Sequence, residues 1–156
     1  MMEQNIVTQV ECNDSIIQVK LLNVEKNSLF VSDIFKQISL MNVNIDMISQ
    51  VMLEDEMRID FTCDQKDQEN LNKALELIKE KHPRMMIYQN RNVAKIMVEG
   101  EKMKDEVGVA AQIFDVFGKY QIPLLQVTTS EISISYVIPD ELLELAVQEI
   151  KNIYQL

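Results

Sequence analysis

The stretch EVGVAAQIFDVFGKYQIPLLQVTTSEISISYVI, residues 106–138, decides the fold that this chain is expected to adopt. In order it contains a glycine, an amphipathic helix pattern, a short turn, an apolar strand and a strand in which Ile132, Ile134, Tyr136 and Ile138 alternate with other residues. A helix period of about 3.6 residues followed by a strand period of 2 predicts the centre of a βαββαβ unit.

The same order of patterns occurs once more, nearer the N-terminus. Apolar residues of the two copies match at a constant offset of 79 residues. The matched pairs are Phe30 and Val109, Ile34 and Ile113, Phe35 and Phe114, Ile38 and Phe117, Val43 and Ile122, Ile45 and Leu124, and Ile48 and Val127. We therefore expect an α+β fold made of two copies of one small unit. We also expect Phe114 to be a buried core aromatic.

Each copy is expected to contain two helices and a set of strands. In the first copy the patterns predict strands at residues 16–24, 44–53, 57–63 and 85–89, and helices at residues 30–41 and 67–80. In the second they predict strands at residues 93–98, 124–130 and 132–138, a helix at residues 109–120 and a last helix from Pro139 onwards. Ser28 and Asp67 are the predicted N-caps of the first copy's helices, because their side-chain oxygens can accept early N–H groups.

The second copy lacks one strand, and residues 6–12 form a strand pattern that the first copy does not need. Because an open strand edge is costly, we expect this leading strand to complete the second sheet. A frayed leader is the alternative. The predicted domains are then residues 15–91 for the first unit, and residues 4–12 together with 92–156 for the second.

Composition restricts the class of protein. The chain has 156 residues and a net charge of −10, with 47% hydrophobic and 26% charged residues, which is enough for one good core or two small ones. An acidic chain is poorly suited to nucleic acid. No apolar run approaches the roughly 20 residues of a membrane span, and the polar start lacks the features of a signal peptide. We therefore expect a cytoplasmic protein with neither nucleic-acid nor membrane partners.

No constellation of catalytic residues is found. The sequence lacks the phosphate-binding loop, the dinucleotide-binding glycine pattern and the Cys-x-x-Cys pair, so we expect no cofactor, no metal and no catalytic residues. The single histidine, His82, stands at the end of a predicted helix and is interpreted as a surface residue. Cys12 and Cys63 are expected to be two buried thiols, with one disulfide as the alternative.

The loops before the two long helices carry the candidate binding chemistry. A helix N-terminus presents unpaired N–H groups and the positive end of its dipole, which suit a carboxylate. In the first unit this loop is Glu25-Lys26-Asn27-Ser28-Leu29, and the strand after the helix starts with Asn44-Ile45-Asp46, whose side-chain oxygens suit an ammonium group. Because that strand start is expected to lie beside the loop, the two segments predict a site for a free amino acid. Turn residues without a ligand are the alternative.

These residues resemble the paired ACT domains that form the regulatory region of aspartate kinases (aspartokinases). The resemblance is carried by Gly108-Val109-Ala110-Ala111, Thr129-Ser130-Glu131-Ile132 and Asn44-Ile45-Asp46-Met47-Ile48, and it covers essentially the whole chain. It implies two ferredoxin-like units, each with an antiparallel sheet and helices on one face. It further implies lysine or threonine at the first-unit loop and Asn44-Ile45-Asp46, bound at the interfaces of a homodimer.

The resemblance also implies a wider set of effector-binding residues. They are Glu25, Ser28, Leu29, Asn44, Ile45, Asp46, Gln50, Gln112, Thr129, Ser130 and Glu131, of which the last four and Gln50 match positions near the family's interfaces. The first loop departs from the family's usual Asp-Lys-Pro-Gly, because Asn27 and Ser28 replace its last two residues. A glycine that allows close approach of the backbone to the ligand is thereby lost.

Three hypotheses follow for the function. The chain is a regulatory module of aspartate kinase, which controls aspartate-family amino-acid biosynthesis by feedback and has a catalytic kinase chain as its partner. Alternatively, it is a free-standing ACT protein, degenerate in ligand binding, that serves dimerisation or the regulation of another partner. A small enzyme of another type is the third. Because no nucleotide-binding stretch is present, phosphotransfer by this chain alone is not expected.

Overall fold

The computed structural model describes residues 5–156, which form two compact units. The first unit is Ser15–Arg91, and the second consists of residues 5–14 together with Asn92–Leu156. Gln4, the predicted first residue of the second unit, lies outside the described residues. The predicted α+β fold is confirmed, since each unit is an antiparallel four-stranded sheet with two α-helices.

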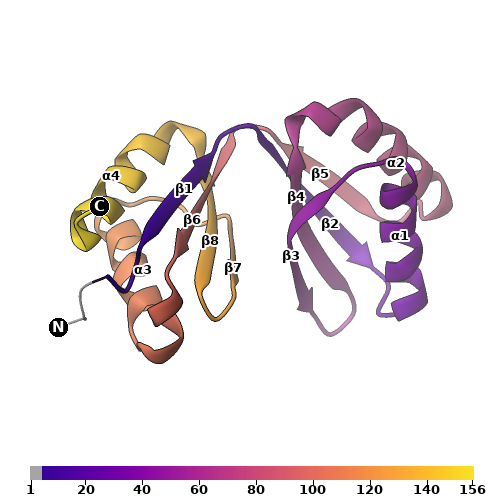
Figure 1. Ribbon diagram of the computed structural model, residues 1–156. Helices are drawn as coiled ribbons and strands as arrows, with labels where there is room; N and C mark the ends of the chain where they lie inside the picture. The colour runs from indigo at the N-terminus through magenta and orange to yellow at the C-terminus, as the bar shows by residue number, and fades with distance from the viewer. Residues whose placement is uncertain (1–4) are drawn as a thin grey trace. The chain divides into compact units, whose positions relative to one another are not determined.

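The first unit has the strand order β3-β4-β2-β5. Its elements are β2 (Ile16–Val24), α1 (Ser28–Leu40), β3 (Ile45–Met52), β4 (Met57–Asp64), a 3-10 turn (Gln65–Asp67), α2 (Gln68–Lys81) and β5 (Met86–Asn90). Both helices cover one face of the sheet (Figure 1). The core between helices and sheet is apolar and includes Phe61 of β4, Ile34 and Ile38 of α1, and Leu71 and Ile78 of α2, all of which are fully buried.

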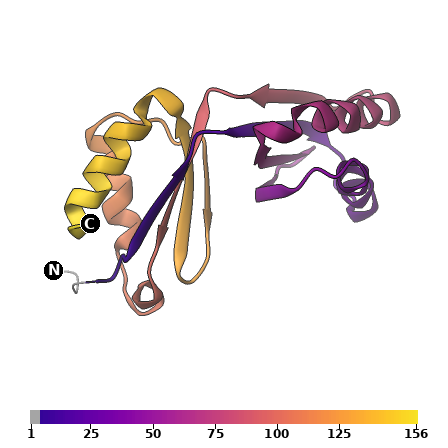
Figure 2. The same cartoon turned by 45° about the horizontal axis from the view of Figure 1, so that its top comes forward.

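The second unit has the strand order β1-β6-β8-β7. Its elements are β1 (Gln9–Asn13), β6 (Val93–Glu99), a 3-10 helix (Glu101–Asp105), α3 (Val109–Lys119), β7 (Gln126–Thr129), β8 (Ser133–Pro139), a second 3-10 turn (Asp140–Leu142) and α4 (Leu143–Tyr154). Figure 2 shows α3 and α4 on the same face of this sheet. Here Tyr136 is the largest buried side chain, and its ring meets Phe117 of α3 at a centroid distance of 4.9 Å.

The N-terminal segment is part of the second unit's sheet. β1 pairs antiparallel with β6, and the preceding residues Ile6 and Val7 are buried in the second core. The backbone of Ile6 lies so close to Gly100 that a Cβ placed on this glycine would stand 1.8 Å from the Ile6 carbonyl oxygen. Only glycine therefore fits at position 100 while this segment is docked.

Several local expectations were wrong. Asn27, not Ser28, is the N-cap of α1. Asp67 does stand at the N-cap position of α2 as predicted, but its side chain makes no capping hydrogen bond, because α2 continues directly from the 3-10 turn. Phe114 is 40% exposed because it lies on the flank of α3, whereas Phe117 faces the core and is 2% exposed.

The two cysteines are free thiols in different surroundings, and the expectation that both are buried was wrong. Cys12 lies on β1 at the edge of its sheet and is exposed, whereas Cys63 of β4 is buried. Burial raises the pKa of the Cys63 thiol to about 12, so this group stays protonated and unreactive near neutral pH.

Candidate functional site

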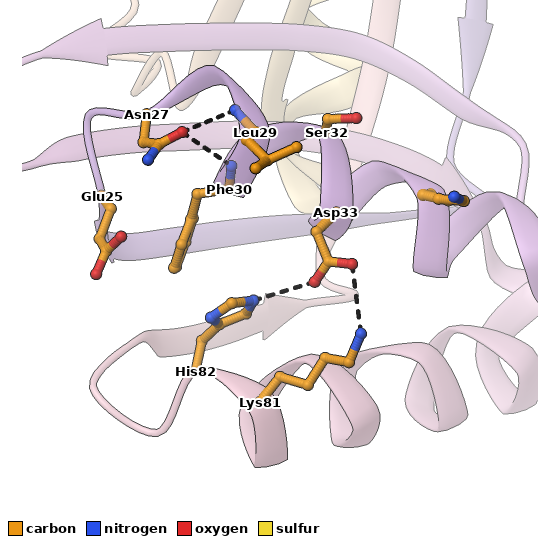
Figure 3. Close-up of a pocket in the computed structure, with 9 residues that line it drawn as sticks. Glu25, Asn27, Leu29, Phe30, Ser32, Asp33, Lys81 and His82 are labelled. Carbon is orange, nitrogen blue, oxygen red and sulfur yellow. Dashed lines mark hydrogen bonds and ion pairs between the residues drawn. The ribbon is translucent and has the colours of Figure 1, made fainter.

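Two adjoining hollows lie at one end of the first unit, around the start of α1. The helix pocket, about 590 Å³, is lined by the first turns of α1 and by Lys81 and His82 at the end of α2 (Figure 3). The hairpin pocket, about 410 Å³, lies between the loop from β2 to α1, the β3–β4 hairpin and the loop from α2 to β5. Glu25, Phe30, Lys81 and His82 line both hollows.

The start of α1 is capped by the chain itself. Asn27 Oδ1 accepts hydrogen bonds from the N–H groups of Leu29 at 2.9 Å and Phe30 at 3.4 Å, as Figure 3 shows. These are two of the N–H groups that the sequence suggested for a ligand carboxylate. The Asn27 carboxamide therefore occupies the N–H groups to which an anion at this helix end would bind.

His82 holds the end of α2 against α1. Its Nε2 lies 3.2 Å from Asp33 Oδ2, and Lys81 Nζ lies 3.4 Å from Asp33 Oδ1. The His82 ring also contacts the Phe30 ring, at a centroid distance of 4.0 Å and an interplanar angle of 48°. The hydrogen bond from His82 is the main reason that the pKa of the Asp33 carboxyl lies below its usual value, with Lys81 adding to the effect. His82 is thus partly buried, with its side chain 20% exposed, and is not the plain surface residue that the sequence predicts. No local pattern signals Asp33 as its partner, because 49 residues separate the two.

Asn23 ties together the three loops around the hairpin pocket. It stands in the left-handed conformation, φ 59°, at a β-bulge where the register of β2 against β4 shifts. Its backbone N–H donates to Glu56 Oε2 of the hairpin at 2.6 Å, and its side-chain amide donates to the Arg84 carbonyl at 3.2 Å. Lys26 of the third loop donates to the carbonyl of Glu54. The bulge thus turns Asn23 toward both neighbouring loops.

The two segments predicted to form one amino-acid site lie at opposite ends of the first unit. Val24, which precedes the Glu25–Leu29 loop, pairs with Met57 of β4. Met57 also pairs with Met52, so the loop lies at the end of the sheet where β3 ends. Ile45, at the start of β3, is level with Cys63. Met57 and Cys63 are six residues apart on β4, which corresponds to roughly 20 Å along the strand. The expectation that the start of β3 lies beside the loop was therefore wrong, because α1 and β3 run in opposite directions.

The remaining first-unit candidates follow β3, the edge strand of the sheet. Asn44 and Asp46 are exposed and Ile45 is half-buried, and the Asp46 carbonyl accepts a hydrogen bond from Thr62 of β4. Gln50 is exposed further along the strand. Between and beyond these polar residues, Ile48, Val51 and Met52 each expose more than half of their side chains. An edge strand with exposed apolar residues is suited to pairing with another chain.

In the second unit, two of the four candidates form structural hydrogen bonds through their side chains. Gln112 Oε1 accepts from the Tyr154 hydroxyl at 2.9 Å, which joins α3 to α4. Ser130 Oγ accepts from the Ser133 N–H at 3.1 Å and closes the β7–β8 turn. Thr129 ends β7 opposite Ile134, and Glu131 is exposed at the tip of the turn. These residues surround the turn and the helix contact, and they do not converge on a hollow.

The loop before α3 differs from its first-unit counterpart. Gly108 is the N-cap of α3, stands at φ 93°, and offers no side chain to cap the helix. Within residues 5–156, no group of three or more His, Cys, Asp or Glu side chains is placed to hold a metal ion. No helix in the same range is long and apolar enough to cross a membrane.

Comparison with known proteins gives consistent results. The model of the ACT domain family matches residues 96–154. The chain is 29% identical to aspartokinase 2 of Bacillus subtilis and 31% identical to an aspartokinase of Pseudomonas aeruginosa, over 99% of its own length in both cases. It spans 38% of the length of each of these relatives.

Solved structures share the fold. A structure of aspartokinase alpha and beta subunits matches with a TM-score of 0.87 at 24% identity, covering 96% of this chain and 99% of that one. The regulatory subunit of aspartate kinase from Thermus thermophilus, in a ligand-free form, matches with a TM-score of 0.85 at 21% identity, covering 94% and 97%. The pair of βαββαβ units found here is therefore also the fold of isolated regulatory chains.

Proposed function

Because this chain is a pair of ACT units of the aspartokinase regulatory type, we propose that it senses lysine or threonine at an interface between two copies of itself. Binding there would favour one arrangement of the copies to the extent that the amino acid prefers it. A catalytic aspartokinase chain that associates with this module would then respond to the end products of its pathway. The chain contributes the sensing part and no kinase chemistry.

One observation carries the proposal: the loop and Asp46 lie at opposite ends of the edge strand β3. A two-fold axis that pairs two β3 strands antiparallel sets the start of one strand against the end of the other. The partner's Asp46 would then approach the Glu25–Leu29 loop of the first copy. The exposed Ile48, Val51 and Met52 would be covered by the same pairing. A site that is divided within one chain becomes complete in a dimer.

The chemistry of the two halves suits a free amino acid. Asn44 and Asp46 of one copy supply oxygens for the ammonium group, and Ser28 of the other supplies a hydroxyl for the carboxylate. Leu29, which is 78% exposed, would cover the side chain of the ligand. We extend the proposal to Glu25, Ile45 and Gln50 beside these residues, and to Gln112, Thr129, Ser130 and Glu131 at the corresponding interface of the second unit.

Mixing two inactive variants tests this arrangement. Asp46→Ala removes the ammonium partner, and Leu29→Glu sets a carboxylate against the ligand at an exposed position. Neither variant alone should bind. In an equal mixture, half of the dimers contain one copy of each, and each of these has one intact site, so about a quarter of the wild-type binding capacity should return. Calorimetric titration with lysine and with threonine measures the capacity. A mixture that binds nothing would show that both halves of the site belong to the same chain.

Asn27 favours a second candidate function, a degenerate ACT pair that serves assembly. Its side chain already occupies the amides of Leu29 and Phe30, so the first-unit loop has fewer groups left for a ligand. If the wild-type chain forms a stable dimer by light scattering and gives no heat with either amino acid, dimerisation is its function.

A further inference from the structure

We propose that Gln65 is a clasp between the two chain segments that connect the units, and that the pairing of β1 in the second unit depends on this clasp. The first unit is inserted between β1 and β6, so the chain enters it at Ser15 and leaves it at Arg91. The proposal concerns this connection and goes beyond the sensing of an amino acid. It gives the first unit a conformational role within a single chain.

The two connecting segments keep one register. In the second unit, the pair of β1 and β6 residues nearest to the connection is Asn13 with Lys95. In the first unit, the corresponding pair of β2 and β5 is Gln18 with Asn90. From Asn13 to Gln18, and from Lys95 back to Asn90, the chain makes equal steps of five residues. Because neither segment is longer than the other, a change in their separation at one end acts on the strand pair at the other end.

Gln65 bonds both segments at the points where they enter and leave the first unit. Its backbone N–H donates to the Ser15 carbonyl at 2.9 Å, and its side-chain amide donates to the Ile16 carbonyl at 3.1 Å. The same amide nitrogen lies 3.5 Å from the Arg91 carbonyl oxygen, and Gln65 Oε1 accepts from the Arg91 guanidinium at 3.2 Å. A carboxamide can hold both segments because it has two N–H donors and one acceptor oxygen.

Both sides of the clasp are held in place by neighbouring residues. Gln65 is half-buried and begins the 3-10 turn after β4, which Asp64 caps by accepting from the Lys66 N–H at 3.1 Å. On the other side, Gln68 Oε1 accepts from the Arg91 guanidinium at 2.9 Å. Because the two partners are positioned by other contacts, little conformational entropy is lost when they bond to each other.

The second unit has a simpler contact at the corresponding place. Asp140 begins the 3-10 turn after β8, and its backbone N–H donates to the Asn92 carbonyl at 3.2 Å. An ionised aspartate side chain carries no N–H group that could bond a second carbonyl. The side-chain clasp therefore belongs to the first unit. Without it, the linking residues 14–15 and 91–92 gain conformational freedom, which must be lost again each time β1 pairs with β6.

Amide hydrogen exchange of the full chain tests the clasp, because it reports the opening of each strand separately. Gln65→Met keeps the length of the side chain and removes its donors and its acceptor. We expect the β1 amides to exchange at least about fivefold faster, the factor that corresponds to the net loss of about one hydrogen bond. The amides of β7, at the opposite edge of the same sheet, should stay within about twofold of wild type.

Two further variants separate the clasp from a general loss of stability. Gln65→Glu keeps an acceptor for the Arg91 guanidinium and loses the donors to the carbonyls, so it should behave like Gln65→Met. Gln68→Met removes a neighbouring amide that bonds side chains of α2 and β5 and the Arg91 guanidinium, and β1 exchange should stay within about twofold of wild type. Unchanged β1 exchange in either Gln65 variant, or an equal rise at β7 or in Gln68→Met, would overturn the proposal.

Discussion

The two units use the same helix position to join their helices, but with different chemistry. Asp33 of α1 corresponds to Gln112 of α3 at the offset of 79 residues that relates the two copies. In the first unit Asp33 binds His82 and Lys81, so the contact between α1 and α2 is charged. In the second unit Gln112 accepts a hydrogen bond from Tyr154, so the contact between α3 and α4 is neutral.

The N-terminal ends of α1 and α3 also differ in their chemistry. Asn27 caps α1 with its side chain, whereas Gly108 has no side chain with which to cap α3. The two cores, by contrast, keep matching positions buried, as Ile38 and Phe117 illustrate. Divergence within this repeat is therefore concentrated at helix ends and helix–helix contacts near the surface. A core position must stay apolar and well packed, while a surface position is free to change its chemistry.

The largest loss of stability is expected at a core position that both units keep buried. Phe117→Ala should lower the free energy of unfolding by about 3–5 kcal/mol, because it empties a buried aromatic site. Phe114→Ala should cost only about 1 kcal/mol, mainly through the lost edge contact of this half-exposed ring with Tyr136. Urea denaturation measures both. Similar costs for the two variants would mean that α3 presents a different face to its sheet.

The same pair of residues shows where sequence reasoning succeeds and fails. Helical periodicity placed α3 correctly, and the strand pattern gave β2 its observed bounds, Ile16–Val24. Periodicity does not resolve the edge of an apolar face, so Phe114 and Phe117, one turn apart, could not be separated. Caps depend on competition between neighbouring side chains, which is why Asn27 displaced Ser28 as the N-cap of α1.

The candidate site was harder to predict than the fold. The sequence identified the loop before α1, which does border two hollows. It did not reveal that the start of β3 lies at the far end of the sheet, because that depends on strand direction and register. The partnership of His82 with Asp33, and the hollow that Arg84 and Asp55 both line, bring together residues far apart in the chain. Such contacts follow from topology and leave no local signal.

An intermediate effect is expected at the two helix starts. Asn27→Ala should lower the stability of the first unit by about 1 kcal/mol, since it removes the acceptor for two N–H groups. Gly108→Ala should cost the second unit about 1–2 kcal/mol for a different reason, because φ at this position is 93° and a Cβ is unfavourable there. Amide exchange reports each unit separately. An unchanged exchange rate for Leu29 in Asn27→Ala would contradict the capping role.

The smallest expected effect is a pH dependence that only the charged contact between α1 and α2 should show, and not the neutral contact between α3 and α4. The pKa of Asp33 is lowered in the folded chain, chiefly by His82, so its contribution to stability is present above the ordinary carboxyl pKa of about 4 and is lost as the pH falls through the lowered value. In the second unit, burial raises the pKa of Tyr154 to about 12, so the Gln112–Tyr154 bond keeps the same protonation throughout the acid range.

Carboxyl titration by NMR tests this difference directly. In His82→Leu the pKa of Asp33 should move up toward its ordinary value, because leucine cannot donate the hydrogen bond that lowers this pKa most, while Lys81 remains. Tyr154→Phe is the matched control, since it removes the helix contact of the second unit and should leave the titration of Asp33 unchanged. A pKa of Asp33 that stays low in His82→Leu would assign the shift to Lys81 and Gln37. The first unit would then join its helices through a simple surface ion pair, and His82 would serve only to pack against Phe30.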